Sequence, residues 1–104
     1  MNPPRYSGFK ILLVDDNPHN LFTLRSLIAL HMDVEILEAE GGEAALALVQ
    51  RHPDIDLVVL DVQMPEIDGF QTARMLKVRK KSRDIPIIFL TAAFKTEAFQ
   101  QQGY

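Results

Sequence analysis

The sequence has 104 residues and a formal net charge of -3, with 47% hydrophobic and 24% charged residues. This length is enough for one domain, and the composition is that of a globular protein rather than a disordered or fibrous one. The lack of cysteine excludes disulfides, thiolate zinc sites and cysteine nucleophiles, and the acidic balance argues against a direct nucleic-acid partner.

The first nine residues are expected to form a leader, ahead of a single domain over residues 10–104. The leader has no apolar core of a signal peptide, and no apolar run approaches the roughly 20 residues that span a bilayer. We therefore expect a cytoplasmic protein with no membrane partner. Residues 11–14 form an uninterrupted apolar run, which predicts a strand buried on both faces.

The segment after this strand is predicted to be an amphipathic helix over residues 18–30. Asn17 followed by Pro18 is a helix-start signal, because an N-cap side chain precedes proline at the first helical position. Alternation of apolar and polar residues over 34–38 predicts a half-exposed strand near a sheet edge. A second helix is expected after the two glycines that follow, ending near Pro53.

Two further apolar runs, at residues 57–60 and 85–90, predict two more strands with a third helix between them. This helix starts near Phe70 and is expected to run into a basic cluster that forms a solvated helix end: Lys77, Arg79, Lys80, Lys81 and Arg83. A fourth helix is expected over residues 94–102. Such alternation predicts an α/β fold, a parallel sheet with helices on both faces.

Three of the predicted strands end in polar groups that can take part in chemistry. Asp15 and Asp16, Asp61, and Thr91 follow the three apolar runs directly. Because parallel strands end at one edge of a sheet, we expect three carboxylates and one hydroxyl in a single crevice. Mg²⁺ prefers oxygen ligands and would relieve the repulsion between the carboxylates. Asp61 could then act as a nucleophile toward a phosphoryl group.

Three motifs in the chain resemble those of the receiver domains of bacterial response regulators. They are LVDDN at residues 13–17, VLDVQMPEIDG at 59–69 and IPIIFLTA at 85–92, in the order and at the separations of that family. The resemblance runs from residue 10 to residue 104. It implies a flavodoxin-like, doubly wound parallel sheet with strand order 2-1-3-4. It also implies a phosphoacceptor that is served by a histidine kinase or phosphotransfer protein, and not an enzyme.

The resemblance assigns roles to individual residues. Asp61 corresponds to the phosphorylated aspartate, and Asp15 and Asp16 correspond to the acidic pair that holds Mg²⁺. Gln63 takes the place whose backbone carbonyl also binds the metal. Thr91 corresponds to the hydroxyl that switches toward the phosphoryl group.

Other positions take secondary roles in this resemblance. Ala92 is the small residue beside the switch hydroxyl, and Ala93, like Gln63, stands where family members tune the lifetime of the phosphoryl group. The predicted helix over 18–30 commonly docks the kinase or phosphotransfer protein. Its positions His19 and Phe22 are therefore candidates for partner contacts.

The chain departs from the family pattern at its end. The family continues into a fifth strand, which ends in a lysine that pairs with the phosphoryl group, and a fifth helix; Lys95 follows Thr91 too closely to be that lysine. An incomplete receiver with impaired phosphorylation is therefore expected. Its last strand, residues 85–90, would be an open apolar edge, so we expect self-association through this strand or a swapped element.

Other functional classes compete with this interpretation. A haloacid-dehalogenase-like phosphohydrolase also uses an aspartate after an apolar strand, but it needs a second acid where this chain has Asn17 or Gln63. A phosphorylation-incompetent interaction or dimerisation module is the alternative that the missing lysine favours. Neither G-x-G-x-x-G nor G-x-x-x-x-G-K-[ST] follows a predicted strand, which argues against nucleotide binding.

Overall fold

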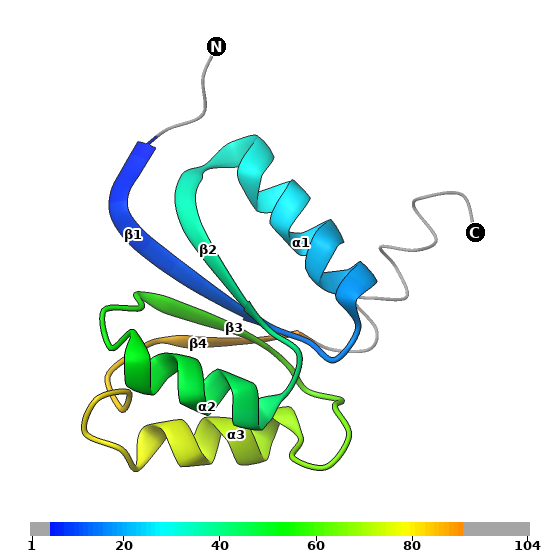
Figure 1. Cartoon of the computed structure of the whole chain (residues 1–104), viewed down its shortest axis with the longest axis vertical. Coiled ribbons are helices and arrows are strands. Elements are labelled where there is room, and N and C mark those ends of the chain that lie inside the picture. Colours follow the sequence, from blue (N-terminus) through cyan, green and yellow to red (C-terminus); the bar gives the residue numbers. More distant parts are fainter. Residues whose placement is uncertain (1–4, 91–104) are drawn as a thin grey trace.

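The computed structural model describes the backbone of residues 5–90 and the side chains of residues 8–90. Four strands alternate with three helices in this part of the chain (Figure 1). In chain order the elements are β1 (Arg5–Val14), α1 (Pro18–His31), β2 (Asp33–Ala39), α2 (Gly42–Arg51), β3 (Leu57–Asp61), α3 (Gly69–Lys77) and β4 (Ile87–Leu90).

The strands form one parallel sheet in the order β2-β1-β3-β4. This order confirms the predicted flavodoxin-like topology, and β2 lies at an edge of the sheet as its alternating pattern predicts. The predicted start of α1 is also confirmed. The Asn17 side chain accepts a hydrogen bond from the amide of His19 at 2.8 Å, and Pro18 is the first residue of the helix.

Helices cover both faces of the sheet, with α1 on one face and α2 and α3 on the other (Figure 1). Side chains alternate along β1 between the two cores. Ile11 and Leu13 pack with Leu21 of α1, whereas Leu12 and Val14 belong to the larger core beneath α2 and α3. All five side chains are buried, and each contributes roughly 1.5–3 kcal/mol of hydrophobic stabilisation. An uninterrupted apolar run is therefore what this strand requires.

The start of β1 differs from the sequence-based expectation. The strand begins at Arg5, within the segment over residues 1–9 that the sequence pattern predicts as a leader. The register with β2 shifts between Arg5 and Lys10, and Gly8 in this stretch has a φ of 80°. A left-handed glycine interrupts the apolar pattern, which is why a bulged strand of this kind is missed.

The end of α3 also differs from the expectation. The helix ends at Lys77, so the prediction that it continues through the basic cluster is wrong. The buried Ser82 hydroxyl donates to the carbonyl of Leu76 at 2.6 Å, and the Lys77 ammonium donates to the carbonyls of Arg83 and Ile85. The Ser82 hydroxyl thus supplies a donor to one of the last carbonyls of the helix, and Lys77 connects the end of α3 to the segment before β4. The residues after Lys77 therefore form the connection to β4.

The last described strand, β4, lies at the other edge of the described sheet. It begins at Ile87, after Pro86, which has no amide to donate to a neighbouring strand. Ile88 and Phe89 are 51% and 38% exposed. Residues 91–104, which include the fourth helix expected over 94–102, lie outside the described residues. None of the described helices has the length and apolar character of a membrane span.

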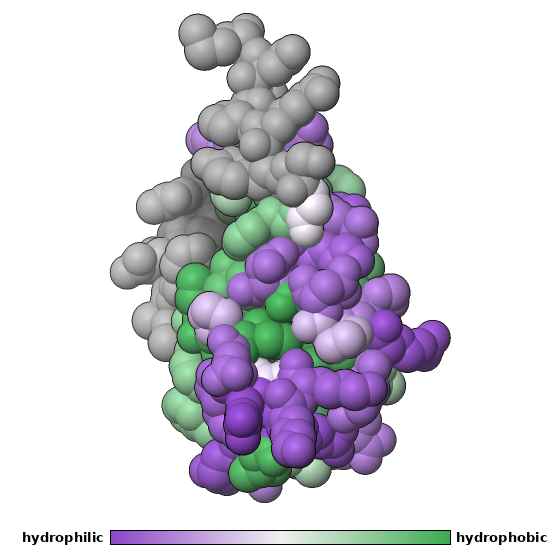
Figure 2. Space-filling model, turned by 90° about the vertical axis from the view of Figure 1, so that its left-hand side faces the viewer, coloured by the Kyte–Doolittle hydropathy of each residue, from purple (hydrophilic) through white to green (hydrophobic). Residues whose placement is uncertain are grey.

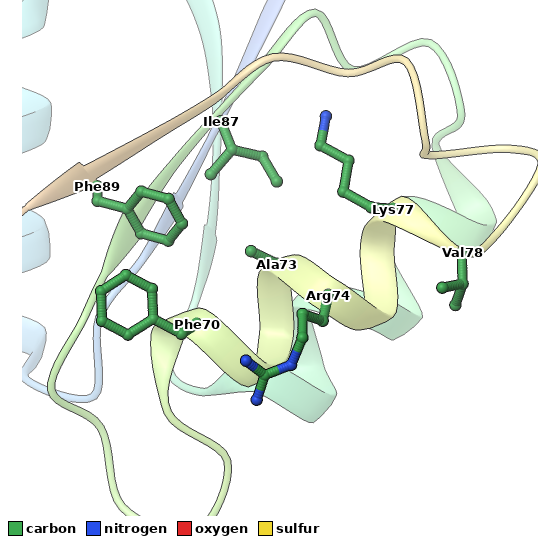
Figure 3. Close-up of a pocket in the computed structure, with 7 residues that line it drawn as sticks. All are labelled: Phe70, Ala73, Arg74, Lys77, Val78, Ile87 and Phe89. Atoms are coloured by element: carbon green, nitrogen blue, oxygen red, sulfur yellow. The ribbon is translucent and has the colours of Figure 1, made fainter.

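Hydrophobic residues also reach the surface elsewhere. Figure 2 shows a face on which hydrophobic residues gather in the middle and hydrophilic residues surround them. Large hydrophobic side chains are exposed on α1 and α3, at the end of α3 and on β4: Phe22, Leu27, Leu30, Phe70, Met75, Val78, Ile88 and Phe89. The rings of Phe70 and Phe89 face each other between α3 and β4, with centroids 5.1 Å apart (Figure 3).

Candidate functional site

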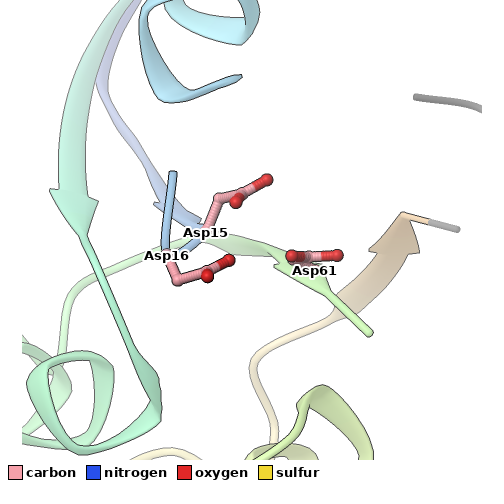
Figure 4. Close-up of side chains that lie close together, drawn as sticks. All are labelled: Asp15, Asp16 and Asp61. Atoms are coloured by element: carbon pink, nitrogen blue, oxygen red, sulfur yellow. The ribbon is translucent and has the colours of Figure 1, made fainter. Parts of the chain in front are cut away.

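The sheet register brings two acidic strand ends together. Val14 is the cross-strand partner of Leu60, so Asp15 and Asp61, which come next on β1 and β3, lie side by side. Oxygen atoms of Asp15, Asp16 and Asp61 all lie within 4.8 Å of one another (Figure 4). The prediction that parallel strand ends collect these carboxylates in one place is therefore confirmed.

Backbone amides orient the two buried carboxylates. The Asn17 amide donates to Asp15 Oδ1 at 3.0 Å, and the Gln63 amide donates to Asp61 Oδ1 at 3.2 Å. In each case the donor lies two residues after the aspartate, which is the geometry of an Asx turn. The side chains of Asp15 and Asp61 are fully buried, whereas Asp16 is exposed. The site therefore has a fixed inner part and one carboxylate open to solvent.

The donor set fits a hard divalent cation. All three groups offer carboxylate oxygens, which Mg²⁺ prefers, and the open side at Asp16 leaves room for the water ligands that Mg²⁺ retains. Three like charges within 4.8 Å repel one another, and a bound cation would offset that repulsion. The arrangement can thus hold a metal ion and present a carboxylate beside it.

The loop between β3 and α3 is held by contacts that the sequence motifs only partly indicate. The Asp68 side chain accepts from the Gln71 amide at 2.8 Å, and the Gln71 side chain accepts from the Asp68 amide at 3.0 Å. The Asp-x-x-Gln spacing is a sequence signal of this capping box. Met64 is buried in the larger core, and Glu66 has a φ of 65°.

The sequence motif also does not explain why residue 69 is a glycine. A β-carbon at this position would collide with the backbone carbonyl oxygen of Asp61 and would lie 2.8 Å from the Cα of Val62. The absence of a side chain therefore allows the start of α3 to approach the end of β3. No local pattern reports this tertiary contact.

Thr91, Ala92 and Ala93 lie outside the described residues, so the switch hydroxyl remains a prediction. The side chain of Gln63 is exposed beside Asp61. The roles of these positions, and of the three aspartates as metal ligands or phosphoacceptor, stay predictions from the sequence.

Comparisons with known proteins agree with this geometry. Residues 11–103 match the response regulator receiver domain family. The sensor histidine kinase GacS of Pseudomonas protegens is 40% identical over 100 residues, which cover 90% of this chain and 11% of the kinase. The chain thus spans about a tenth of the length of that relative.

Solved structures show the same fold. The N-terminal domain of a response regulator receiver protein from Methanoculleus marisnigri JR1 is 28% identical, with a TM-score of 0.70, over 88% of this chain and 76% of that one. The receiver domain of a signal transduction histidine kinase from Syntrophus aciditrophicus is 27% identical, with a TM-score of 0.73, over 88% of this chain and 71% of that one. With its four parallel strands and its acidic cluster at Asp15, Asp16 and Asp61, the chain belongs to the response regulator receiver domain family of two-component signalling.

Proposed function

We propose that this chain is a phosphoacceptor in which Asp61 takes a phosphoryl group from a histidine kinase or a phosphotransfer protein. The observation that carries the proposal is the meeting of three carboxylates, from the ends of β1 and β3, within 4.8 Å. Family membership supports it, because receiver domains are signalling phosphoacceptors rather than enzymes in their own right.

The transfer is a displacement at phosphorus. A carboxylate oxygen of Asp61 attacks the phosphorus of a phosphohistidine, the bond between phosphorus and the imidazole nitrogen breaks, and the electron pair stays on that nitrogen. The product is an acyl phosphate on Asp61 and a free histidine on the donor. The Gln63 amide, at 3.2 Å from Asp61 Oδ1, holds the nucleophile in one orientation during the attack.

Mg²⁺ is the proposed cofactor. Asp15, Asp16, Asp61 and the backbone carbonyl of Gln63 would hold it. When bound, it would neutralise negative charge on the phosphoryl oxygens. Asp15 is kept in place by the Asn17 amide, and Asp16 stands at the solvent-exposed side, where the donor enters. Thr91 is proposed to move toward the new phosphoryl group and so to signal its presence.

The docking face for the donor is proposed to be α1. This helix starts three residues after Asp15, and its Phe22 side chain is 66% exposed, with Leu27 and Leu30 also exposed on the same helix. His19, one turn earlier, is also exposed. A partner that covers Phe22 would bring a phosphohistidine to the acidic cluster.

Intact mass after incubation with Mg²⁺ and phosphoramidate tests the proposal. One added phosphoryl group is expected on the chain and on the control Asp84→Asn, which removes an exposed carboxylate far from the cluster in sequence. Asp61→Asn should carry no label, and hydroxylamine should remove the label from the others because an acyl phosphate is cleaved by this nucleophile. A label that persists in Asp61→Asn, or no label on either this chain or a folded version extended through the family's fifth strand and helix, would refute the assignment.

An interaction module is the second candidate function. The observation that favours it is β4, the last strand of the described sheet, whose Ile88 is 51% exposed on the face opposite α3. A second copy could pair with this edge. Sedimentation velocity over a range of concentrations should then show a dimer that Ile88→Lys abolishes, and a monomer at every concentration would rule this candidate out.

A further inference from the structure

A short turn connects β1 to α1. Strand β1 ends at Val14 and helix α1 begins at Pro18, so only residues 15–17 lie between them. The first two, Asp15 and Asp16, belong to the acidic cluster and project from the end of β1 (Figure 4). The third, Asn17, therefore stands between these two carboxylates and the start of the helix.

Asn17 forms hydrogen bonds in both directions along the chain. Its amide donates to Asp15 Oδ1 at 3.0 Å. Its side chain accepts from the amide of His19 at 2.8 Å, and its carbonyl accepts from the amide of Leu21 at 3.2 Å. The same residue thus holds a carboxylate at the end of β1 and the first turn of α1.

The side chain of Asn17 ties the backbone of this residue to the helix. Asn17 has an extended backbone, with a φ of -103° and a ψ of 114°, as an N-cap residue requires. Pro18 favours the same extended backbone at the residue before it. Without the side-chain acceptor, the His19 amide loses this hydrogen bond and the first turn of α1 opens more often. Each opening frees the backbone of residue 17, so its amide points at Asp15 for less of the time.

The second buried carboxylate is held in a different way. Asp61 Oδ1 accepts from the Gln63 amide at 3.2 Å, but α3 begins only at Gly69. The cap of that helix belongs to Asp68, so one residue orients the carboxylate and another starts the helix. In the turn after β1, both tasks fall to Asn17.

We propose that Asn17 is a positioning residue of the Mg²⁺ site, which keeps Asp15 oriented by means of its cap on α1. The inference rests on the proposed function, because it takes Asp15 as a ligand of Mg²⁺. The Asp15 amide donates to the Ala39 carbonyl at 3.1 Å, so its backbone is fixed to β2 and the Asn17 amide restricts the rotation of its side chain. A ligand that is already oriented binds a cation more tightly.

A cap that serves the helix alone would have a different effect. Loss of an N-cap side chain lowers the stability of any helix, so a less stable Asn17→Ala does not distinguish the two roles. The affinity of the folded chain for Mg²⁺ does distinguish them. The Asn17 side chain is exposed and is not one of the three carboxylates, so it can change this affinity only through another residue.

Titration of the isotopically labelled full chain with Mg²⁺, followed by NMR of the backbone amides, tests the proposal. Asn17→Ala should raise the Kd for Mg²⁺ about tenfold, the lower end of the range for groups that orient metal ligands. Asn17→Ser should stay within about twofold of the unsubstituted chain, because serine is an N-cap of similar strength and adds no charge. Solvent exchange of the residue 17 amide should be faster in Asn17→Ala than in the other two proteins.

Thr23→Ala is the matched control in the same part of α1. The Thr23 hydroxyl donates to the carbonyl of His19 at 3.1 Å, so this substitution removes a side-chain hydrogen bond near the start of the helix and leaves the cap in place. Its Kd for Mg²⁺ should change less than about twofold. If Asn17→Ala does not fold, Asn17→Gly takes its place, because glycine at an N-cap costs little stability and offers no side-chain acceptor.

Two results would overturn the positioning role while the proposed function stands. One is an unchanged Kd for Mg²⁺ in Asn17→Ala, measured at a temperature at which its spectrum is that of a folded protein. The other is a Kd that rises as much in Asn17→Ser or in Thr23→Ala as in Asn17→Ala. Amides that do not respond to Mg²⁺ even in the unsubstituted chain would instead refute the metal assignment of the proposed function, and this inference with it.

Discussion

Gly69 lies so close to Asp61 that a β-carbon on residue 69 would collide with the carbonyl oxygen of Asp61. The Gly69 amide also donates to the carbonyl of Val62 at 2.9 Å, which fixes the first turn of α3 to the end of β3. This contact ties the backbone of the proposed phosphoacceptor to the first turn of α3. A shift of the Asp61 backbone toward Gly69 would have to displace the start of that helix.

Replacing Gly69 with alanine should disturb both the fold and the site. The added methyl group must push back the backbone of Asp61, and overpacking of this kind lowers the free energy of unfolding by about 1–3 kcal/mol. Phosphorylation of Asp61 should also be slower, because its carboxylate moves relative to the Gln63 amide. Urea unfolding and intact mass measure the two effects.

Gly41→Ala is the matched control for this substitution. A β-carbon at Gly41 meets no atom within 4 Å, and its φ of 176° is extended backbone that any residue adopts. Its free energy of unfolding should stay within about 0.5 kcal/mol of the unsubstituted chain. Equal stabilities of the two variants would show that the contact between Gly69 and Asp61 is not as tight as described.

Asp16→Asn should separate metal binding from stability. Its side chain is exposed, so the substitution leaves the core intact while it removes one of three charges within 4.8 Å. In metal-free buffer the variant should be more stable, by up to about 1 kcal/mol, because two such charges in water repel by about that amount. Thermal unfolding in EDTA measures this gain.

Addition of Mg²⁺ should raise the Tm of the unsubstituted chain above that of Asp16→Asn, which reverses the order expected in EDTA. A cation that binds only the folded state stabilises it as its concentration rises, and the unsubstituted chain, with all three carboxylates, should gain more than Asp16→Asn. The Tm of Asp84→Asn should follow that of the unsubstituted chain. Equal gains in the chain and in Asp16→Asn would mean that Asp16 takes no part in holding the metal.

The acidic cluster could be predicted from the sequence because two local features are enough to define it. The apolar runs at residues 11–14 and 57–60 mark strands buried on both faces, and each of these two runs is followed by an acid. The parallel sheet then places Asp15 beside Asp61 through the pairing of Val14 with Leu60. The strand order 2-1-3-4 followed from the family motifs and is confirmed. The local sequence pattern and the family topology together are therefore enough to predict the acidic cluster.

Details that depend on tertiary contacts could not be predicted in the same way. The end of α3 depends on Ser82, which is buried and donates to the carbonyl of Leu76 six residues earlier. Gly69 resembles any turn glycine until its distance from Asp61 is known. The irregular start of β1 depends on its pairing with β2. None of these contacts leaves a periodic signal in the sequence.

Asp68→Ala tests the capping box at the start of α3, where the loop that follows β3 ends. Loss of the hydrogen bond from the Gln71 amide should lower the free energy of unfolding by about 1 kcal/mol, as for other N-cap substitutions. Gln71→Ala removes only the reciprocal bond to the Asp68 amide and should cost less. Urea unfolding of both single variants and the double variant measures the coupling, and strictly additive effects would contradict a reciprocal cap.

The Lys10 and Asp54 side chains form an ion pair near the end of the sheet opposite the acidic cluster. This ion pair should make the stability of the fold depend on pH. The Lys10 ammonium donates to the Asp54 carboxylate at 2.5 Å and lies 3.8 Å from a carboxylate oxygen of Glu35. This hydrogen bond lowers the pKa of Asp54 below its ordinary 3.8 and raises the pKa of Lys10 above its ordinary 10.5. A carboxyl with a lowered pKa stabilises the fold above its ordinary value, and that contribution is lost as the pH falls through the folded pKa.

Asp54→Asn should therefore be less stable than the unsubstituted chain at neutral pH, and the difference should vanish once the pH falls well below 3.8. On the alkaline side, the contribution of Lys10 is present below 10.5 and is lost as the pH rises through its raised pKa, so the difference should shrink there as well. The Asp54 carboxylate is exposed and the Lys10 side chain is partly buried, so high salt should reduce the effect in part. Urea unfolding across this pH range, with Asp84→Asn as the control, measures it. A difference between Asp54→Asn and the unsubstituted chain that is the same at every pH would mean that lost packing, and not the ion pair, causes the destabilisation.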